Sequence, residues 1–430
     1  MKKAIVVGSG AGGATAAREL QGAFQVIVLE AGNRFRPVAG SLSMFEKLKK
    51  SPGLFSSEKR IEWLFPSMKI ALSGDGMVLA RGLCHGGSTT LSTGSVLRQD
   101  QDLRAIGIDL EAEFVALERE LPIHIDHRSR WHEPTRQAFE VCREMGLDPK
   151  PTPKMIRREQ CKDCGRCILG CPSGAKWDSR EFLDEAVAGG AELVSGQHVR
   201  EVVIENGRAT GVTVGGSGRG RFYGADLVVL AAGGLGTPII LQQSGIECTG
   251  ALFVDPVFCV AAPWQGARQD HELSMPFLFQ REHYMVSPYF DWLSFFFNKA
   301  WRYPAGDIFT LMIKLADTSV GSVTPGAVRK PLQDADRAHL DEAVGLCKDI
   351  LRKLGRKDED FFLGTLNAGH PGGMLPLTGN EAETLHHRHL PDNLYVADAT
   401  LLPRSMGNPP ILTIMALAKK VSGLCIEKLG

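Results

Sequence analysis

Apolar residues in the first thirty positions follow a strand–helix–strand order. The run from Ala4 to Val7 has the continuous hydrophobicity of a strand buried on both faces of a parallel sheet. The segment Ala14 to Leu20 is rich in helix-forming residues, and a second apolar run, Gln25 to Leu29, predicts another strand. The pattern therefore predicts a β–α–β unit at the start of the chain.

The turn between the first strand and the helix carries glycines that fit the pattern G-x-G-x-x-G. Gly8 permits the tight turn, Gly10 lets the backbone approach a pyrophosphate, and Gly13 lets the helix pack close to the strand. Ala11 belongs to the same turn, and the helix start offers free N–H groups to phosphate. Glu30 ends the second strand, where a carboxylate can accept a hydrogen bond from a ribose hydroxyl. Together these features predict a dinucleotide site.

The same hydrophobic patterns mark further elements along the chain. The predicted helices are residues 110–120, 134–146 and 180–188, one beginning at Pro238, and the final one, 411–429. The predicted strands lie at Val194 and at residues 199–205, 209–214, 226–232 and 392–398, and Asn206-Gly207 forms a hairpin turn between the second and third of them.

Residues 251–365 carry much of the chain's aromatic content, including the run Phe295-Phe-Phe297. We expect a separate lobe here, in which the rings either form a second hydrophobic core or line a pocket for an apolar substrate. Both interpretations stay open at this point.

Composition excludes some classes of function. The chain has 430 residues, long enough for two sizeable cores, and its 49 basic and 49 acidic residues give a net charge of zero. Nothing indicates nucleic-acid binding, and no apolar run is long enough to cross a bilayer. The first strand begins within three residues, which leaves no room for a signal peptide. We expect a cytoplasmic protein, either free or associated with a membrane.

The order of these motifs resembles the glucose–methanol–choline (GMC) oxidoreductases. The resemblance rests on the first glycine loop, on Arg81-Gly…His85-Gly-Gly-Ser88, on residues 228–244 (VVLAAGGLGTPIILQQS), on His370-Pro-Gly-Gly373, and on residues 393–418 (NLYVADATLLPRSMGNPPILTIMALA). It covers the nucleotide-binding half from both ends, whereas the central lobe matches only in position.

The resemblance implies an α/β fold with a discontinuous Rossmann-like FAD-binding domain and a second, α+β substrate-binding lobe built on a sheet. The expected division is residues 1–105, 178–250 and 366–430 for the FAD-binding domain, 106–177 for a helical insertion with a cysteine-rich loop, and 251–365 for the substrate lobe. In this family the flavin takes a hydride from an alcohol carbon while a histidine removes the hydroxyl proton.

Carried over by position, the resemblance makes His370 the catalytic base and Asn408 its partner. Imidazole titrates near neutrality and can accept an alcohol proton, and an amide can hold the developing oxyanion without adding charge. Glu30 then binds the adenosine ribose, and Asp398 lies near the pyrophosphate and ribityl chain. The other FAD contacts that we expect are Arg81, His85, Gly86, Gly87, Ser88, Val199, Ala232, Asn408 and Pro409.

Four cysteines form a run with the spacing C-x2-C-x2-C-x3-C-P: Cys161, Cys164, Cys167 and Cys171. This is the spacing of bacterial ferredoxins, in which the fourth cysteine ligates a second cluster, and this chain has one run. The fourth ligand of a [4Fe–4S] cluster is then either Cys171 or a distant thiol, such as Cys84, Cys142 or Cys259.

Two other interpretations of the run remain, a zinc ion and free structural thiols. GMC members that oxidise long-chain alcohols and sterols have a similar segment, matched here through Gly174-Ala175-Lys176, which need not hold iron.

These features predict an FAD-dependent enzyme that oxidises the CH–OH group of a bulky, apolar alcohol. A cluster would pass electrons to a carrier such as a ferredoxin, a quinone or a cytochrome. The alternative is a flavin and iron–sulfur reductase or desaturase acting on a C=C bond. A third possibility, a non-enzymatic electron-transfer subunit, is disfavoured because carriers rarely need a large apolar pocket.

Overall fold

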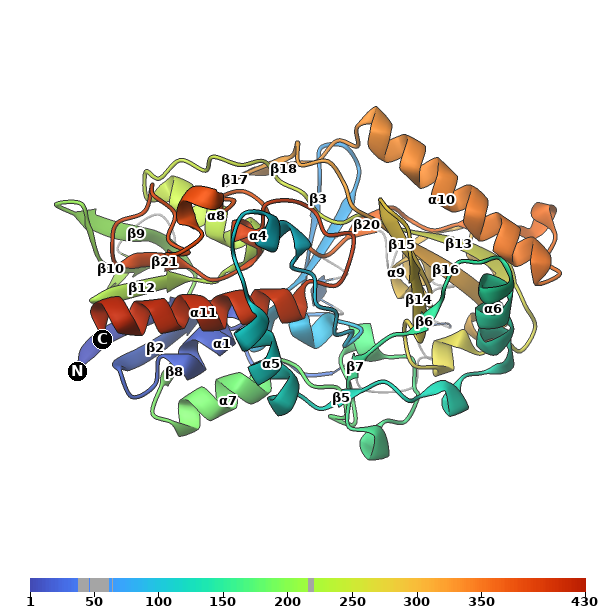
Figure 1. The fold of residues 1–430 in the computed structure, drawn as a ribbon, viewed down its shortest axis with the longest axis horizontal. Coiled ribbons are helices and arrows are strands. Elements are labelled where there is room, and N and C mark those ends of the chain that lie inside the picture. The colour runs from blue at the N-terminus through green and yellow to red at the C-terminus, as the bar shows by residue number, and fades with distance from the viewer. Residues whose placement is uncertain (38–45, 47–61, 64, 216–219) are drawn as a thin grey trace.

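A five-stranded parallel sheet assembled from distant parts of the chain forms one half of the protein (Figure 1). The structure is a computed structural model that describes residues 1–37, 46, 62–63, 65–215 and 220–430. In sheet order the strands are β21 (Leu394–Val396), β12 (Leu227–Leu230), β1 (Lys2–Val7), β2 (Phe24–Glu30) and β8 (Glu192–Ser195). All five strands were predicted from their apolar runs, within three residues at each end.

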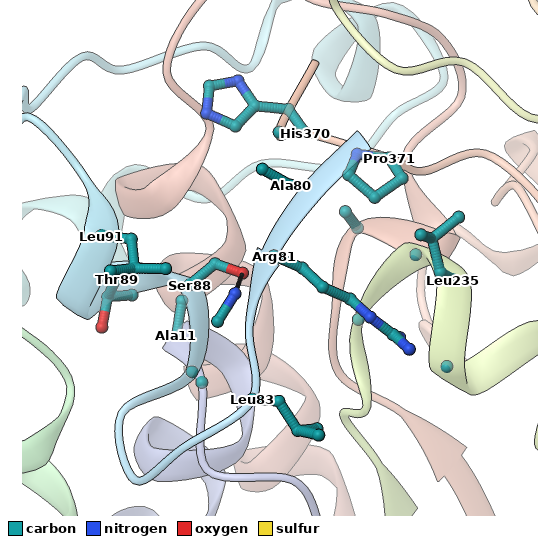
Figure 2. A pocket seen from close by; sticks show the side chains of 18 of the residues that line it. Ala11, Ala80, Arg81, Leu83, Ser88, Thr89, Leu91, Leu235, His370 and Pro371 are labelled. Atoms are coloured by element: carbon teal, nitrogen blue, oxygen red, sulfur yellow. Dashed lines mark hydrogen bonds between the residues drawn. The ribbon is translucent and has the colours of Figure 1, made fainter. Parts of the chain in front are cut away.

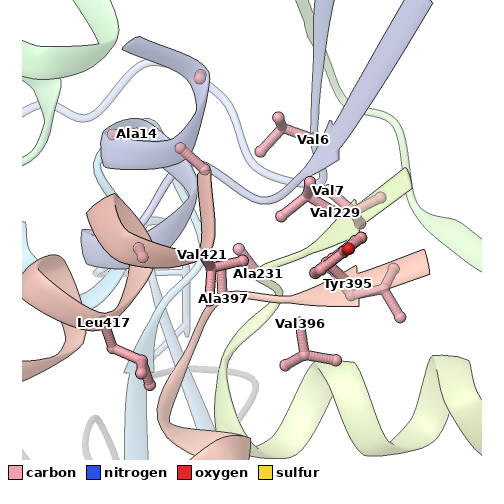
Figure 3. Close-up of a cluster of buried hydrophobic side chains, with 14 of the residues drawn as sticks. Val6, Val7, Ala14, Val229, Ala231, Tyr395, Val396, Ala397, Leu417 and Val421 are labelled. Carbon is pink, nitrogen blue, oxygen red and sulfur yellow. The ribbon is translucent and has the colours of Figure 1, made fainter. Parts of the chain in front are cut away.

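Helices α1 (Ala11–Glu19) and α11 (Ile411–Leu429) pack together beside this sheet. Figure 3 shows Val421 of α11 beside Ala231 and Ala397. Gly12 of α1 is essential to the close packing, because a Cβ there would lie 1.6 Å from the carbonyl oxygen of Ala397. Residues from the two ends of the chain therefore share one core.

Further helices flank this half: α4 (Gln101–Ala105), α5 (Glu111–Glu120) and α7 (Arg180–Ala188). Helix α7 has the predicted bounds, and α5 differs from its prediction by one residue. The predicted hairpin is confirmed as β9 (Val199–Glu205) and β10 (Arg208–Val214), to which β11 (Arg221–Gly224) adds a third strand.

Helix α8 (Gly233–Gln243) begins five residues before Pro238, so the predicted start was wrong. Proline is most common in the first turn of a helix, and that preference placed the prediction too late. The glycine-rich segment before Pro238 packs against the loop that follows His370, and a Cβ on Gly234 would lie 1.9 Å from the carbonyl oxygen of Pro371.

The second half is built on a larger, mostly antiparallel sheet (Figure 1). In sheet order its strands are β3 (Met68–Leu72), β4 (Val78–Gly82), β20 (Asn367–Ala368), β13 (Val257–Pro263), β16 (Ile308–Leu315), β15 (Tyr284–Pro288), β14 (Phe277–Gln280) and β6 (Lys150–Pro151). Strand β19 (Phe362–Leu363) also pairs with β13. The segment around Pro151 contributes a short strand at the edge of this sheet.

Two helices that cover this sheet, α6 (Glu133–Glu144) and α10 (Asp334–Lys353), pack against each other. Helix α10 presents buried residues at helical spacing, namely Ala343, Cys347, Ile350 and Leu351. Many of the aromatic residues of 251–365 lie in two buried clusters, one beneath these helices and one around α9 (Trp292–Phe297). The remaining short strands are β5 (Ile123–His124), β7 (Lys154–Met155), β17 (Ser322–Thr324) and β18 (Ala327–Arg329).

None of the helices in the described ranges is long and apolar enough to cross a membrane.

Candidate functional site

A single cavity of about 1030 Å³ joins the two halves of the protein. This volume lies at the upper end of the range for small-molecule sites, roughly 300–1,000 Å³. Twelve of the predicted site residues line it: Gly8, Gly10, Ala11, Glu30, Arg81, Gly87, Ser88, Val199, Ala232, His370, Asp398 and Pro409. The topology thus brings together residues from stretches of sequence that lie as far apart as Gly8 and Pro409.

The first glycine loop leaves room for a ligand on its cavity side. Gly8 has a φ of +98°, and a Cβ there would lie 2.4 Å from the carbonyl oxygen of Ala231. A Cβ on Gly13 would lie 2.1 Å from the carbonyl oxygen of Gly8, so Gly13 serves helix packing and does not line the cavity. Around Gly10 the nearest atom to such a Cβ is 4.0 Å away. The loop therefore offers open backbone next to the start of α1, as a phosphate requires.

Two helices, α1 and α11, begin at the cavity without a side-chain cap and without an acidic residue in the first turn. Their first N–H groups are free to interact with a ligand that carries negative charge. Asp398 instead serves the start of α8, because its carboxylate accepts hydrogen bonds from the Gly233 N–H at 2.8 Å and the Thr237 hydroxyl at 2.5 Å. Burial raises the pKa of Asp398.

Glu30 is fixed at the end of β2 by three hydrogen bonds. Its Oε2 accepts from the N–H of Ser9 at 2.9 Å and from the Ser9 hydroxyl at 2.6 Å, and its Oε1 accepts from the N–H of Gly32 at 2.7 Å. A carboxylate has about four acceptor positions, so one remains for a ligand hydroxyl. Both the position and the free acceptor suit a ribose.

His370 and Arg81 enter the cavity from neighbouring strands. Strands β20 and β4 run parallel, and Ala368 pairs with Leu79, so His370 and Arg81 follow at equivalent positions two residues later. Figure 2 shows His370 near Ala80, with the Arg81 side chain extending toward Leu235 of α8. Burial lowers the pKa of the Arg81 guanidinium.

The His370 ring has one buried and one accessible side. Its side chain is 29 % exposed, yet its Nδ1 atom is buried and makes no hydrogen bond with any residue in the described ranges. Nδ1 lies 3.5 Å from Oδ2 of Asp255, so Nε2 is the ring nitrogen available to a ligand. Burial is the largest cause, and the Lys314 ammonium the second, of a fall in the pKa of His370 to about 4.

Asp255 and Lys314 were not predicted as site residues. Lys314 lines the cavity, and its Nζ lies 3.3 Å from Oδ2 of Asp255. Burial opposes ionisation of Asp255, but Lys314, His370 and Ser405 together hold the pKa of Asp255 below its usual value. A lysine inside the apolar strand Ile308–Leu315 was the signal that could have found this pair, because buried charges are rare unless paired.

Apolar side chains line the part of the cavity that belongs to the second half. They include Phe65, Met68, Ile168, Leu169, Met275, Trp292, Leu293, Phe296, Phe297 and Met312, with Tyr289 among them. The sequence left open whether the aromatic residues of 251–365 form a second core or line a pocket. Some of them form a core, and others line this cavity.

Three of the predicted contacts besides Gly13 do not line the cavity: His85, Gly86 and Asn408. His85 Nε2 lies 2.7 Å from the Ser195 hydroxyl, and the N–H of Gly86 donates to Ser9. The amide nitrogen of Asn408 donates to Gln280 Oε1 at 3.0 Å and to the Met406 carbonyl at 3.2 Å. The structure thus turns the Asn408 donor away from the predicted pairing with His370.

The four cysteines of the run surround one small void of about 10 Å³, separate from the large cavity. The described part of the chain contains no group of three or more His, Cys, Asp or Glu side chains placed to hold a metal ion. The more distant candidates Cys84, Cys142 and Cys259 are buried elsewhere and do not line this void. Ile168 and Leu169, which lie within the run, line the large cavity, so this loop forms part of its wall.

Comparison with known proteins places this geometry in context. The sequence profile described as GMC oxidoreductase matches residues 3–252. An uncharacterised protein of Methanocaldococcus jannaschii is 27 % identical over 421 residues, which cover 96 % of this chain and 97 % of that protein. A long-chain-alcohol oxidase of Arabidopsis thaliana is 22 % identical over 99 % of this chain and 66 % of its own length. The crystal structure of pyridoxine 4-oxidase from Mesorbium loti has the same fold, with a TM-score of 0.73 at 17 % identity, over 98 % of this chain and 99 % of that one.

Proposed function

The chain belongs to the GMC oxidoreductase family and is an FAD-dependent oxidoreductase, and we propose that its substrate is a bulky, apolar alcohol oxidised at its CH–OH group. The observation that carries this proposal is the single cavity that contains the glycine loop, Glu30, His370 and the aromatic wall. The likeness to a long-chain-alcohol oxidase supports the same class of substrate.

In this proposal the residues of the first half hold FAD. The open backbone at Gly10 and the uncapped start of α1 accept the pyrophosphate, and Glu30 accepts a ribose hydroxyl. The start of α11 supplies positive potential to the flavin. When bound, FAD accepts a hydride from the substrate carbon.

The substrate side depends on His370 and on the apolar wall. His370 is neutral at physiological pH, because its pKa is lowered to about 4, and its Nε2 can accept the hydroxyl proton. Trp292 and Phe296 exclude water and favour a hydrocarbon group over a polar one. In our proposal Asn408 becomes the partner of His370 only if its side chain turns away from Gln280.

Flavin reduction under anaerobic conditions tests the proposal. We expect 1-dodecanol to bleach the flavin absorbance faster than ethanol does. We expect His370→Gln to retain FAD and to slow this reduction by about 100-fold or more, as loss of a general base does. His389→Gln, a change at an exposed histidine, is the matched control. Equal rates for His370→Gln and the control would remove His370 from the mechanism.

A C=C reductase is the second candidate, because Tyr289 and Arg81 line the same cavity and would offer it a phenol and a guanidinium. A reductase of this class needs a proton donor there. With the flavin first reduced by dithionite, reoxidation by an α,β-unsaturated ketone but not by an aldehyde would favour this candidate.

For the cysteine run, we propose a [4Fe–4S] cluster held by Cys161, Cys164, Cys167 and Cys171. Supporting it are the spacing and the void that the four thiols share. Because the void is small, the thiols must part to admit a cluster. When bound, a cluster accepts single electrons, which suits a ferredoxin, quinone or cytochrome acceptor.

Iron and acid-labile sulfide assays on protein purified without oxygen test the cluster. We expect about four of each per chain, and the loss of both in Cys164→Ser. Absence of iron from the unmodified protein would favour free structural thiols.

A further inference from the structure

A buried ion pair lies directly behind the proposed base. The side chains of Lys314 and Asp255 are 2 % and 1 % exposed, and Lys314 Nζ donates to the Asp255 carbonyl at 3.2 Å and lies 3.3 Å from Oδ2. Removing two charges from water is costly, so a buried pair beside a reactive group calls for a functional explanation.

The strand register brings this pair to His370. Val257 at the start of β13 pairs with Lys314 of β16 on one side and with Asn367 of β20 on the other. Asp255 precedes Val257 by two residues, and His370 follows Asn367 by three. As a result, Lys314 Nζ and His370 Nδ1 approach the same atom, Asp255 Oδ2, at 3.3 and 3.5 Å.

Other polar and charged groups lie around the Lys314–Asp255 pair. The second carboxylate oxygen of Asp255 accepts hydrogen bonds from the Ser405 hydroxyl and from the Gly407 N–H. Behind the pair, Asp317 forms an ion pair of 2.8 Å with Lys330. Arg81 is the cation on the neighbouring strand, and the electrostatic influences on the His370 pKa come from Lys314 and Asp255.

We infer that Asp255 and Lys314 are positioning residues: Asp255 orients the His370 ring from its Nδ1 side, and Lys314 offsets the Asp255 charge, so that Nε2 can accept a proton. Asp255 lies where it can fix the buried Nδ1 side of the ring. A lone carboxylate at this distance would favour the protonated imidazolium, which cannot act as a base. The Lys314 ammonium cancels the charge of Asp255 and so prevents this.

The inference rests on the proposed function only for the role of His370 as the base. The state of the His370 ring can be measured without any substrate. The inference also agrees with the low pKa of His370. Burial and Lys314 lower this pKa, and Asp255 raises it.

The test is an NMR titration of FAD-loaded protein with ¹³C-labelled histidine, in which His370→Gln identifies the resonance. In unmodified protein we expect His370 to titrate below pH 5. In Lys314→Met, which leaves the carboxylate unpaired, we expect its pKa to rise above the ordinary value of about 6.5. In the double variant Lys314→Met, Asp255→Asn we expect the pKa to fall again, because both charges are gone.

Lys330→Met is the comparison variant, because it breaks the buried Lys330–Asp317 pair, whose carboxylate accepts the Asp255 N–H at 2.8 Å, and leaves the Lys314–Asp255 pair intact. We expect the His370 pKa to stay below 5 in this variant. A His370 pKa of 6.5 or more in the unmodified protein overturns the inference, even if Lys314→Met fails to fold. Equal shifts in Lys314→Met and Lys330→Met also overturn it.

Anaerobic reduction by 1-dodecanol supplies a second measurement. The rate in Lys314→Met should fall at least about fourfold between pH 8 and pH 6, as the imidazole protonates, whereas the rate in unmodified protein stays level. Absence of any reduction by alcohols in unmodified protein contradicts the proposed function, while the NMR result still decides the roles of Lys314 and Asp255.

Discussion

Gly234, in the first turn of α8, lies directly against the carbonyl oxygen of Pro371, the residue after His370. A Cβ on Gly234 would lie 1.9 Å from that oxygen. The contact joins the helix that follows β12 in the nucleotide-binding half to the loop that carries the proposed base, so each fixes the position of the other.

Gly234→Ala should therefore move His370 relative to the flavin. Displacement of a catalytic group by about 1 Å can cost 100-fold in rate, so we expect flavin reduction by 1-dodecanol to slow by about 10- to 100-fold. Gly345→Ala in α10, where a Cβ meets nothing within 4 Å, is the control and should leave the rate unchanged. Equal rates in both variants would show that the loop tolerates the extra atom.

Removal of the Glu30 side chain should weaken FAD binding. Glu30→Ala deletes the proposed ribose contact and leaves the N–H groups of Ser9 and Gly32 without their acceptor. A hydrogen bond from a ribose hydroxyl to a charged carboxylate contributes about 1.5–3 kcal/mol, so we expect the Kd for FAD to rise at least tenfold. Flavin fluorescence during reconstitution of the apoprotein measures this. Glu19→Gln, at the far end of α1, should bind FAD normally.

Tyr289→Phe separates the two candidate reactions. If the protein oxidises alcohols, His370 takes the proton, and loss of the Tyr289 hydroxyl should change the rate of flavin reduction by less than about threefold. If the protein reduces C=C bonds and Tyr289 is the donor, reoxidation of the reduced flavin by an enone should fall by about 100-fold. Stopped-flow absorbance follows both half-reactions in the same preparation.

His127 should make the fold sensitive to acid. Trp131 Nε1 donates to its Nδ1 at 2.9 Å and Thr152 O lies 2.9 Å from its Nε2, which fixes a neutral ring. Burial lowers the pKa of His127 to about 4. Between pH 6.5 and pH 4 the unfolded chain takes up a proton that the folded protein does not, so stability falls by roughly 3 kcal/mol over this window.

The measurement is the melting temperature at pH 7 and at pH 4.5. In His127→Gln we expect a smaller difference between the two temperatures than in unmodified protein, because glutamine does not titrate. Burial lowers the pKa of His386 as well, so His386→Gln serves as the comparison variant. An identical acid response in His127→Gln contradicts the assignment.

Local sequence patterns predicted the nucleotide-binding half well, because its strands are buried on both faces and its turns need glycine at fixed positions. Strand β1 and helix α7 are examples, each recognisable from its own residues. Helix α10 was not predicted, although its buried positions recur at helical spacing and its first turn has a capping box formed by Gln333 and Asp336. The many aromatic residues of this region favoured the prediction of a sheet and a pocket instead.

The candidate site shows where sequence reasoning ends. Glu30 and His370 were predicted because they occur in motifs, and they line the cavity. Asp255 and Lys314 occur in no motif, and only the register of β13 with β16 and β20 brings them to His370. Asn408 shows that a motif alone does not fix where a side chain points. Its motif predicts a partner for His370, but its amide nitrogen donates to Gln280.

The position of β21 beside β12, together with the packing of α11 on α1, has a consequence for biosynthesis. A nascent chain exposes its glycine loop early, but the edge strand and the helix that complete this core are synthesised much later. The cofactor site is therefore complete only once α11 has been made, and a product truncated before β21 would expose its hydrophobic sheet to proteases.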